Sequence, residues 1–325
     1  MSGIWGNNIK ISIFGESHGE AVGVNICGLP AGMEVDSDFI KDELLRRAGG
    51  WDEFSTTRRE PDDYKFLSGV FNGKLSGSPV CCVIPNINTR SADYSKIKNI
   101  MRPSHADYTA FIKYGGNNDY RGGGHFSGRI TAALVIAGAL CKMYLKQHGV
   151  EIESKILTKG LEEKILQAKS ENDSIGGRVE VMIKGVSPGI GSPFFDSVES
   201  VLSHLFFSIP GVKGVEFGAG FSLADMKGSQ ANDEFYIQDD KILTKTNNSG
   251  GINGGITNGM PIVACLAFRP TSSIAKEQNT VDISSMENVT YAIKGRHDPC
   301  IARRGAVVAE SAAAIGITDL IMENK

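Results

Sequence analysis

The stretch SGRITAALVIAGALCKMYLKQH, residues 127–148, is apolar on almost every side until Lys142. Its alanine content favours a helix, and a helix with so little polar surface must be buried over most of its length. A second helix of this kind is predicted at residues 305–322, GAVVAESAAAIGITDLIM. Two such helices need covering on more than one side, which sheets on both faces of a helical layer would provide.

The strands expected in these sheets are short β-branched runs bounded by Gly, Pro or Asn. They are predicted at residues 9–14, 21–27, 65–70, 79–84, 178–184 and 262–269. Several lie in adjacent pairs across short turns, which favours antiparallel pairing over alternating βαβ units. Two more helices are predicted at residues 36–48 and 195–207, the second with apolar residues at helical spacing. The predicted fold class is therefore α+β.

The overall composition excludes several classes of protein. A net charge of −3 and a pI of about 6.1 lack the basic excess of a nucleic-acid-binding protein. No run of 18 apolar residues predicts a membrane span, and residues 1–14 lack the apolar core of a secretion signal. Six cysteines without a C-x-x-C pair are typical of reduced thiols. We expect a cytoplasmic protein with no nucleic-acid or membrane partner.

No linker divides the chain clearly, although the charged residues 154–177 are the best candidate. We therefore expect a single domain over residues 1–325. Glycine is abundant, at 39 of 325 residues or 12%, against about 7% in average usage. Six glycines lie within residues 115–128 and five within residues 250–259. Because glycine lets backbone come close to a ligand, these two stretches are candidate binding cradles.

Histidines and arginines gather beside glycine in the first half of the chain. His18 lies in the segment Gly15-Glu16-Ser17-His18-Gly19, where it is either a proton-transfer group or a turn residue. Arg46-Arg47 and Arg58-Arg59 suggest an anion clamp, or else a solvated helix end and a charged loop.

The densest cluster contains Arg102-Pro103-Ser104-His105-Ala106-Asp107 and Asp119-Tyr120-Arg121-Gly122-Gly123-Gly124. It leads into the first apolar helix, whose opening N–H groups can hold a phosphate or carboxylate. Arg129 lies in the first turn of that helix, where a cation opposes the helix dipole. An anion that Arg129 binds would explain its position.

Two further clusters lie in the second half of the chain. The glycine-rich residues 249–259 and the run Arg269-Pro270-Thr271-Ser272-Ser273 could line a phosphorylated cofactor, although the first is also typical of a flexible surface turn. Asp298 could serve as a base, a metal ligand or a turn former. No zinc motif is present, so no metal is expected.

Four of these motifs, in order along nearly the whole chain, resemble chorismate synthase. They are Gly15–Gly19, Arg102–Asp107, Asp119–Gly124 and Gly295-Arg296-His297-Asp298-Pro299-Cys300. The resemblance implies a β-α-β sandwich with a central helical layer between antiparallel sheets, assembled as a homotetramer. It also implies a lyase that eliminates phosphate from 5-enolpyruvylshikimate 3-phosphate in an anti-1,4 sense to give chorismate, with reduced FMN as the cofactor.

The resemblance also implies roles for individual residues. His18 would protonate or hydrogen-bond the flavin, His105 would act as general acid toward the departing phosphate, and Asp298 would work with flavin N5 in removing the C6 hydrogen. Substrate would bind to Arg47, Arg102, Arg129 and Arg296, with Arg58 and Arg59 as weaker candidates. FMN would contact Arg47, His125, Phe126, Ser127, Gly254, Arg269, Pro270, Thr271, Ser272, Ser273 and Arg296.

The chain departs from the family pattern in three places. Some members have an arginine near Glu53, so one nucleotide or substrate contact of the family is in question here. His125-Phe126 stand where many members have Arg-Ser, which puts the side-chain part of that FMN contact in question. The chain is also shorter than many family members around residues 155–174. A flexible flap of the family is therefore either deleted there or left out of the numbered sequence. Because no reductase domain is added, an external flavin reductase is the expected partner, with NADPH as an indirect reductant. The residues leave two alternatives open, a flavodoxin-like FMN carrier and a flavin-independent phosphate-transferring enzyme.

Overall fold

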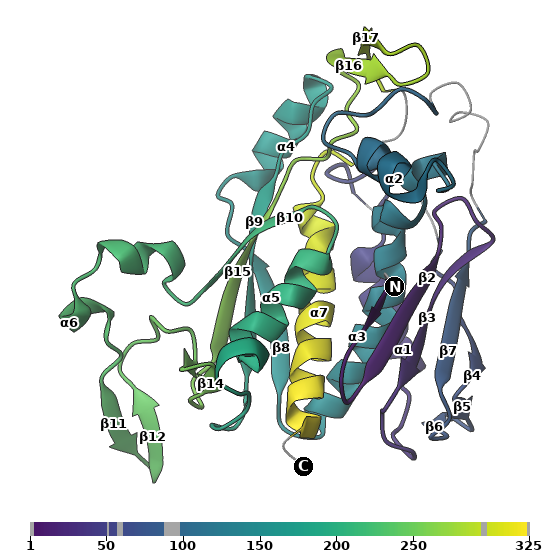
Figure 1. Ribbon diagram of the computed structural model, residues 1–325. Coiled ribbons are helices and arrows are strands. Elements are labelled where there is room, and N and C mark those ends of the chain that lie inside the picture. The colour runs from purple at the N-terminus through teal and green to yellow at the C-terminus, as the bar shows by residue number, and fades with distance from the viewer. Residues whose placement is uncertain (1–2, 51, 57–60, 88–97, 294–297, 324–325) are drawn as a thin grey trace.

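The computed structural model describes residues 3–50, 52–56, 61–87, 98–293 and 298–323. Two antiparallel sheets enclose a layer of helices, as the two apolar helices predicted (Figure 1). The α+β sandwich inferred from the sequence is thereby confirmed.

The first sheet has five strands in the order β1-β2-β3-β7-β4. Their bounds are β1 (Ile4–Trp5), β2 (Lys10–Gly15), β3 (Ala21–Cys27), β7 (Val80–Pro85) and β4 (Lys65–Ser68). The central strand β3 places Val24 opposite Ile13 of β2 and Cys82 of β7. Val22, Val24 and Ile26 belong to the hydrophobic core, so this sheet turns an apolar face to the helices.

The second sheet has four strands in the order β10-β15-β9-β8. Their bounds are β10 (Val212–Phe217), β15 (Ile262–Phe268), β9 (Gly177–Lys184) and β8 (Glu151–Ile156). β9 buries every second residue, which is the pattern of a strand with one covered face. The sequence did not predict β8 or β10, because Glu151, Glu153 and Lys155 of β8 and Lys213 and Glu216 of β10 obscure the apolar alternation.

The helical layer contains α1 (Ser37–Arg47), α3 (Thr131–Lys146), α5 (Val198–Ser208) and α7 (Ala302–Glu323). α3 begins four residues later than predicted, because two 3-10 turns, η2 (Arg121–Phe126) and η3 (Gly128–Ile130), precede it. α3 with η3 and α7 are long and apolar enough to cross a membrane. However, 78% and 83% of their most apolar windows are buried inside the fold, as in core helices.

In the part of the chain that the structure describes, three shorter helices and four hairpins lie around this body. The helices are α2 (Asp107–Tyr114), α4 (Leu161–Ser170) and α6 (Gly228–Ala231). The hairpins are β5 (Val70–Phe71) with β6 (Lys74–Leu75), β11 (Phe235–Gln238) with β12 (Lys241–Thr244), β13 (Ile252–Asn253) with β14 (Ile256–Thr257), and β16 (Gln278–Asp282) with β17 (Glu287–Tyr291). Residues 154–177, the candidate linker, instead contain α4, which Leu161 and Ile165 anchor in the core.

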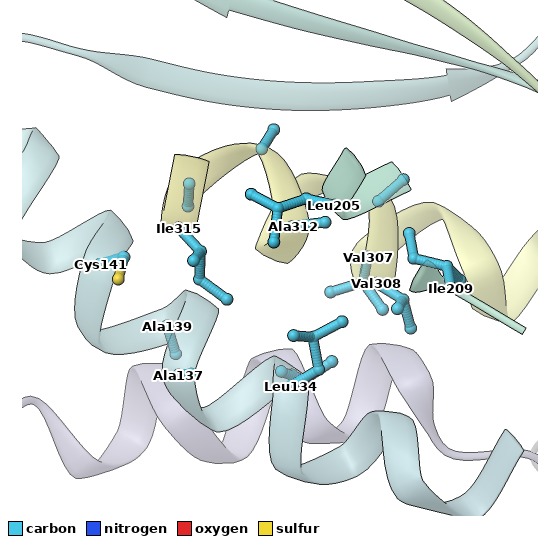
Figure 2. Close-up of a cluster of buried hydrophobic side chains, with 14 of the residues drawn as sticks. Leu134, Ala137, Ala139, Cys141, Leu205, Ile209, Val307, Val308, Ala312 and Ile315 are labelled. Carbon is cyan, nitrogen blue, oxygen red and sulfur yellow. The ribbon is translucent and has the colours of Figure 1, made fainter. Parts of the chain in front are cut away.

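The contact between α3 and α7 lies at the centre of the core. A Cβ on Gly138 of α3 would lie 2.2 Å from the Cβ of Ser311 on α7, so the two helix backbones approach as closely as glycine allows. Small residues also lie along these helices, and Figure 2 labels Ala137 and Ala139 on α3 and Ala312 on α7, with larger side chains such as Leu134 and Ile315 between the two helices. Packing of this kind fixes the relative position of the two helices.

A buried ionic network joins α1, α3 and α7. Lys142 of α3 donates to both Glu43 and Glu310, and Arg46 donates to the same two carboxylates. The side chains of Glu43 and Glu310 are almost fully buried. Two cations balance two anions, which lets these charges remain inside the helical layer.

We expect Gly138→Ala to destabilise the fold, although alanine is the better helix former. The added methyl group must push α7 away, and overpacking of this kind costs about 2 kcal/mol. Urea unfolding followed by circular dichroism measures the change. Gly228→Ala is the matched control, since a Cβ there meets nothing within 4 Å. Equal midpoints for the two variants would contradict the close contact.

Candidate active site

A cavity of about 820 Å³ opens where the N-terminal ends of α3 and α7 meet the C-terminal end of α1. The structure brings most of the predicted site residues to its wall. These residues are Arg47, Arg102, His105, His125, Phe126, Ser127, Arg129, Arg269, Pro270, Thr271, Ser272, Ser273 and Asp298. Residues from opposite ends of the sequence therefore share one site.

A turn of three glycines separates the two predicted histidines. Gly122, Gly123 and Gly124 all have positive φ values, which other residues rarely adopt. A Cβ on Gly122 would lie 2.5 Å from Cδ2 of His18, and a Cβ on Gly123 would lie 3.0 Å from Cε1 of His105. The turn thus needs glycine both for its backbone and for its contact with each imidazole ring.

His105 is held by an aspartate and an arginine from its own motif. Its Nδ1 lies 2.8 Å from Oδ1 of Asp107 and 3.0 Å from Nη2 of Arg102. Arg102 also binds Asp107 in a bidentate manner, at 2.7 and 2.6 Å. Burial raises the pKa of Asp107, but hydrogen bonds from Arg102 and His105 outweigh it and hold that pKa well below the usual range. The carboxylate favours a proton on Nδ1 of His105, so Nε2 is left to act on the cavity side.

Two of the predicted clamp arginines share one buried carboxylate, that of Asp62. Arg47 donates to it from Nη2 at 2.6 Å and from Nε at 3.1 Å, and Arg129 forms a short contact with its other oxygen. All three side chains are at most 4% exposed. Burial and the neighbouring arginines Arg304 and Arg129 lower the pKa of Arg47 to about 10, although Asp62 opposes them.

The anion that the sequence predicted beside Arg129 is therefore part of the chain itself. Burial raises the pKa of Asp62, but Arg47 and Arg129 lower it by more, so the carboxylate is charged at neutral pH. Within the part of the chain that the structure describes, one carboxylate lies between the two arginines, so these three side chains together carry a net positive charge. The pair is thus both held in place and still able to attract an anion.

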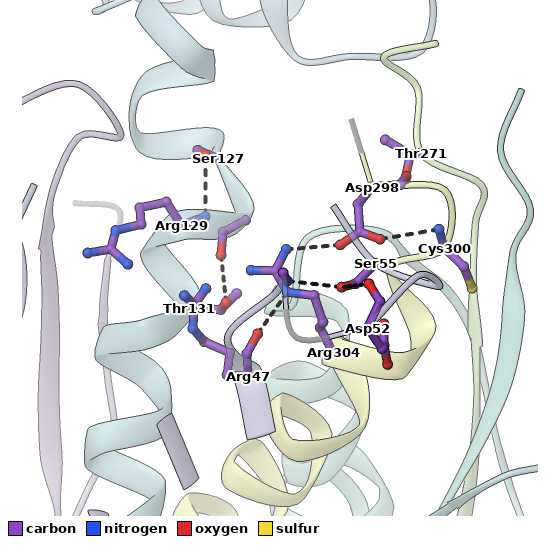
Figure 3. Close-up of polar contacts among 12 residues, drawn as sticks. Arg47, Asp52, Ser55, Ser127, Arg129, Thr131, Thr271, Asp298, Cys300 and Arg304 are labelled. Carbon is purple, nitrogen blue, oxygen red and sulfur yellow. Dashed lines mark hydrogen bonds and ion pairs between the residues drawn. The ribbon is translucent and has the colours of Figure 1, made fainter. Parts of the chain in front are cut away.

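Asp298 is fixed at the start of α7 (Figure 3). Its Oδ2 accepts a hydrogen bond from Nη1 of Arg304 at 2.9 Å, and its Oδ1 accepts one from the backbone N–H of Cys300 at 3.3 Å. Arg304 also donates to the carbonyl oxygen of Arg47 at 2.7 Å. Arg304 thus connects the predicted catalytic aspartate to the end of α1.

Some predicted site residues lie apart from the cavity or outside the described residues. His18 is buried behind Gly122 and does not line the cavity. Gly254 lies in the turn of the β13–β14 hairpin, next to Gly255, which contacts the start of α5. The opposite end of α5 borders the cavity. The eleven residues of α5 separate the two by about 16 Å. Arg296, Arg58 and Arg59 lie outside the described residues.

Sequence reasoning missed the residues that support the predicted ones. Asp62, Asn86 and Arg304 are not among the predicted site residues. A signal for Asp62 did exist, because buried arginines need a carboxylate partner. Among the described residues, no group of three or more His, Cys, Asp or Glu side chains is arranged to hold a metal.

The sandwich and its arginine-rich, histidine-flanked cavity define an enzyme that acts on a small anionic substrate. A family model described as chorismate synthase matches residues 9–322. The chorismate synthase of Thermococcus kodakarensis is 44% identical over 98% of both chains, and that of Chitinophaga pinensis is 47% identical over 98% of this chain and 96% of the relative. A crystal structure of chorismate synthase, 28% identical, matches 98% of this chain and 93% of its own with a TM-score of 0.76. The chain belongs to the chorismate synthase family of carbon–oxygen lyases, which serves aromatic amino-acid biosynthesis.

We expect Asp107→Asn to destabilise the protein by about 2 kcal/mol at pH 7, because a charged acceptor is lost from Arg102 and His105. Since the folded-state pKa of Asp107 is lowered, its contribution is present above an unfolded pKa of about 3.9 and disappears as pH falls below it. Urea unfolding of both proteins from pH 7 to pH 3 measures this. A difference that stays constant down to pH 3 would contradict the ion pair.

Proposed function

We propose that this chain eliminates phosphate from 5-enolpyruvylshikimate 3-phosphate in an anti-1,4 sense to give chorismate, with reduced FMN required. The observation that supports this best is the meeting of His105, held by Asp107, with the arginine pair Arg47 and Arg129 in one cavity. Overall, phosphate leaves C3 with the C–O electron pair and C6 loses a proton, whose C–H electrons enter the new diene, so the reaction involves no net oxidation or reduction.

The arginines would bind and orient the substrate. Phosphate and carboxylate groups suit the planar donors of guanidinium, and Arg47, Arg102 and Arg129 all border the cavity. Because these side chains are largely buried, water screens their charge little and the attraction to an anion is strong. Arg296 remains a predicted member of this clamp.

His105 would give a proton to the departing phosphate. With Nδ1–H directed at Asp107, a second proton on Nε2 makes an imidazolium that the carboxylate stabilises. Transfer of the Nε2 proton to the leaving oxygen neutralises charge as the C3–O bond breaks. Arg304 fixes the carboxylate of Asp298. This carboxylate would assist removal of the C6 hydrogen by holding a proton on one of its oxygens.

The residues around the cavity fit a phosphorylated flavin. Arg269 and the hydroxyl groups of Ser272 and Ser273 supply donors suited to a phosphate, and Thr271 borders the same wall with its hydroxyl donating to the carbonyl oxygen of Asp298. Leu134, Ile209 and Val308 supply an apolar wall suited to a ring system. Reduced FMN, when bound, supplies an electron-rich partner that eases loss of phosphate and of the C6 hydrogen. By the resemblance to the family, His18 would hydrogen-bond this cofactor, although its ring lies behind Gly122 and does not itself border the cavity.

The His125-Phe126 pair stands in place of the Arg-Ser pair of many members. Nδ1 of His125 lies 2.8 Å from the carbonyl oxygen of Gly15, so this nitrogen is engaged within the protein. Phe126 is partly exposed at the cavity. We therefore assign these two residues apolar and backbone contacts with FMN, and Ser127 a polar one.

We propose a cytoplasmic homotetramer of single-domain chains. Its support is the exposure of large apolar side chains, with Phe194 85%, Phe195 90% and Phe221 82% exposed, which is typical of surfaces that are covered in an assembly. If Gly254 contacts FMN, the distance along α5 requires that the flavin belong to another subunit. An external reductase, with NADPH as its electron source, would supply reduced FMN.

The decisive experiment supplies enolpyruvylshikimate phosphate and chemically reduced FMN under anaerobic conditions and measures released phosphate and chorismate. We expect turnover only when reduced FMN is present. Flavin binding without phosphate release would indicate a flavin carrier instead. Turnover without flavin would indicate the flavin-independent enzyme.

His105→Ala should lower kcat about 10²- to 10⁴-fold, because the general acid is lost. FMN affinity, measured by fluorescence quenching, should change little, since His105 is assigned to the phosphate. Asn117→Ala, at an exposed position that does not border the cavity, is the control. Equal losses of turnover and FMN affinity in His105→Ala would refute the assigned role.

A further inference from the structure

Asn86 joins the arginine pair to the turn that carries His18. It follows β7, and its Nδ2 donates to the carbonyl oxygens of Glu16 at 2.9 Å and Gly19 at 3.0 Å. Its Oδ1 accepts a hydrogen bond from Nε of Arg129 at 3.1 Å. Two carbonyls require the amide nitrogen and a guanidinium requires the amide oxygen, so the neighbours allow only this orientation of the side chain.

Backbone hydrogen bonds also hold the His18 turn. The N–H of Gly19 donates to the carbonyl of Glu16 at 3.1 Å, and the N–H of Ser17 donates to the carbonyl of Gly124 at 3.1 Å. The N–H of Asn86 donates to the carbonyl of Glu20 at 2.9 Å, just beyond the turn. The side chain of Asn86 adds its two bonds to carbonyls before and after His18, so it restrains the turn on both sides.

On its other side, Asn86 contacts a residue that is itself fixed. Arg129 is bound to Asp62, which also binds Arg47. A continuous chain of hydrogen bonds thus leads from Arg47 through Asp62, Arg129 and Asn86 to the His18 turn. These groups come from α1, the segment after it, the 3-10 turn before α3 and the end of β7.

We propose that Asn86 is a positioning residue that sets the place of His18 relative to the arginine pair. This inference rests on the proposed function, in which His18 hydrogen-bonds FMN and the arginines bind substrate. Asn86 touches neither ligand in this role. It acts by holding the loop between β2 and β3 against the wall of the substrate site, so the two ligands meet in a fixed relation.

Asparagine is required for this role because the site needs two donors and one acceptor. An aspartate does not suit the same geometry, since a carboxylate can accept from Arg129 but repels the carbonyls of Glu16 and Gly19. Asn86→Asp therefore keeps the contact with the arginine and removes those with the His18 turn. Asn86→Ser has one donor and no charge, which separates the loss of donors from the added charge.

A double-mutant cycle on FMN binding tests the proposal. In the wild-type background, Asn86→Asp should weaken FMN binding about tenfold, the equivalent of two hydrogen bonds of about 0.7 kcal/mol each. In a His18→Ala background the same change should alter the Kd less than about twofold, because the group that Asn86 positions is gone. Asn86→Ser should show the same dependence on His18 with a smaller effect.

Asn117→Asp is the matched control. Asn117 also donates from Nδ2 to two carbonyl oxygens, those of Tyr114 and Gly115, but it is exposed and does not border the cavity. We expect FMN affinity to be unchanged in this variant. Equal weakening by Asn86→Asp with and without His18, or no weakening at all, would overturn the proposal. Because oxidised FMN is the probe and no turnover is needed, failure of the proposed reaction would appear separately, as wild-type protein that binds FMN but releases no phosphate.

Discussion

The close contact between α3 and α7 is the constraint on which the rest of the structure depends. Gly138 and Ser311 let the two helix backbones approach, and the alanines beside them leave no room for a polar layer. Because neither helix has a polar face, both must be covered by other elements. The two sheets, together with α1 and α5, provide this cover, and the buried ionic network of Glu310 and Lys142 ties α1 to both helices.

The same contact determines where the active site lies. The N-terminal ends of α3 and α7 point to one end of the helical layer, so the segments before them line a single cavity. Helix N-termini favour anions, yet Arg129 and Arg304 lie at these two ends. The carboxylates of Asp62 and Asp298 offset their charge. Because Asp62 serves both Arg47 and Arg129, these three arginines outnumber the two carboxylates, so the site stays cationic while acids of the chain itself hold its arginines.

Glycine gives the site its second constraint. At Gly122 and Gly123 the backbone turns with positive φ and lies against His18 and His105. Side chains at these positions would displace the imidazole rings. The glycine-rich stretch was predicted to be a cradle for ligand, and two of its glycines make room for the imidazole rings of the two histidines that are predicted to transfer protons. The other stretch, around Gly254, lies away from the cavity of its own chain.

The sequence alone determined the apolar helices, the antiparallel strands beside them and the family, because hydrophobic periodicity and motif order are local properties of the chain. It also predicted His105, Arg47 and Asp298 as site residues, since these residue types beside glycine and proline are unusual, and all three border one cavity. Only the tertiary structure decided which groups support them. Asp62, Asn86 and Arg304 look ordinary in the sequence, and their roles come from partners up to 257 positions away. Buried polar groups must find partners in space, and no local pattern records which ones they find.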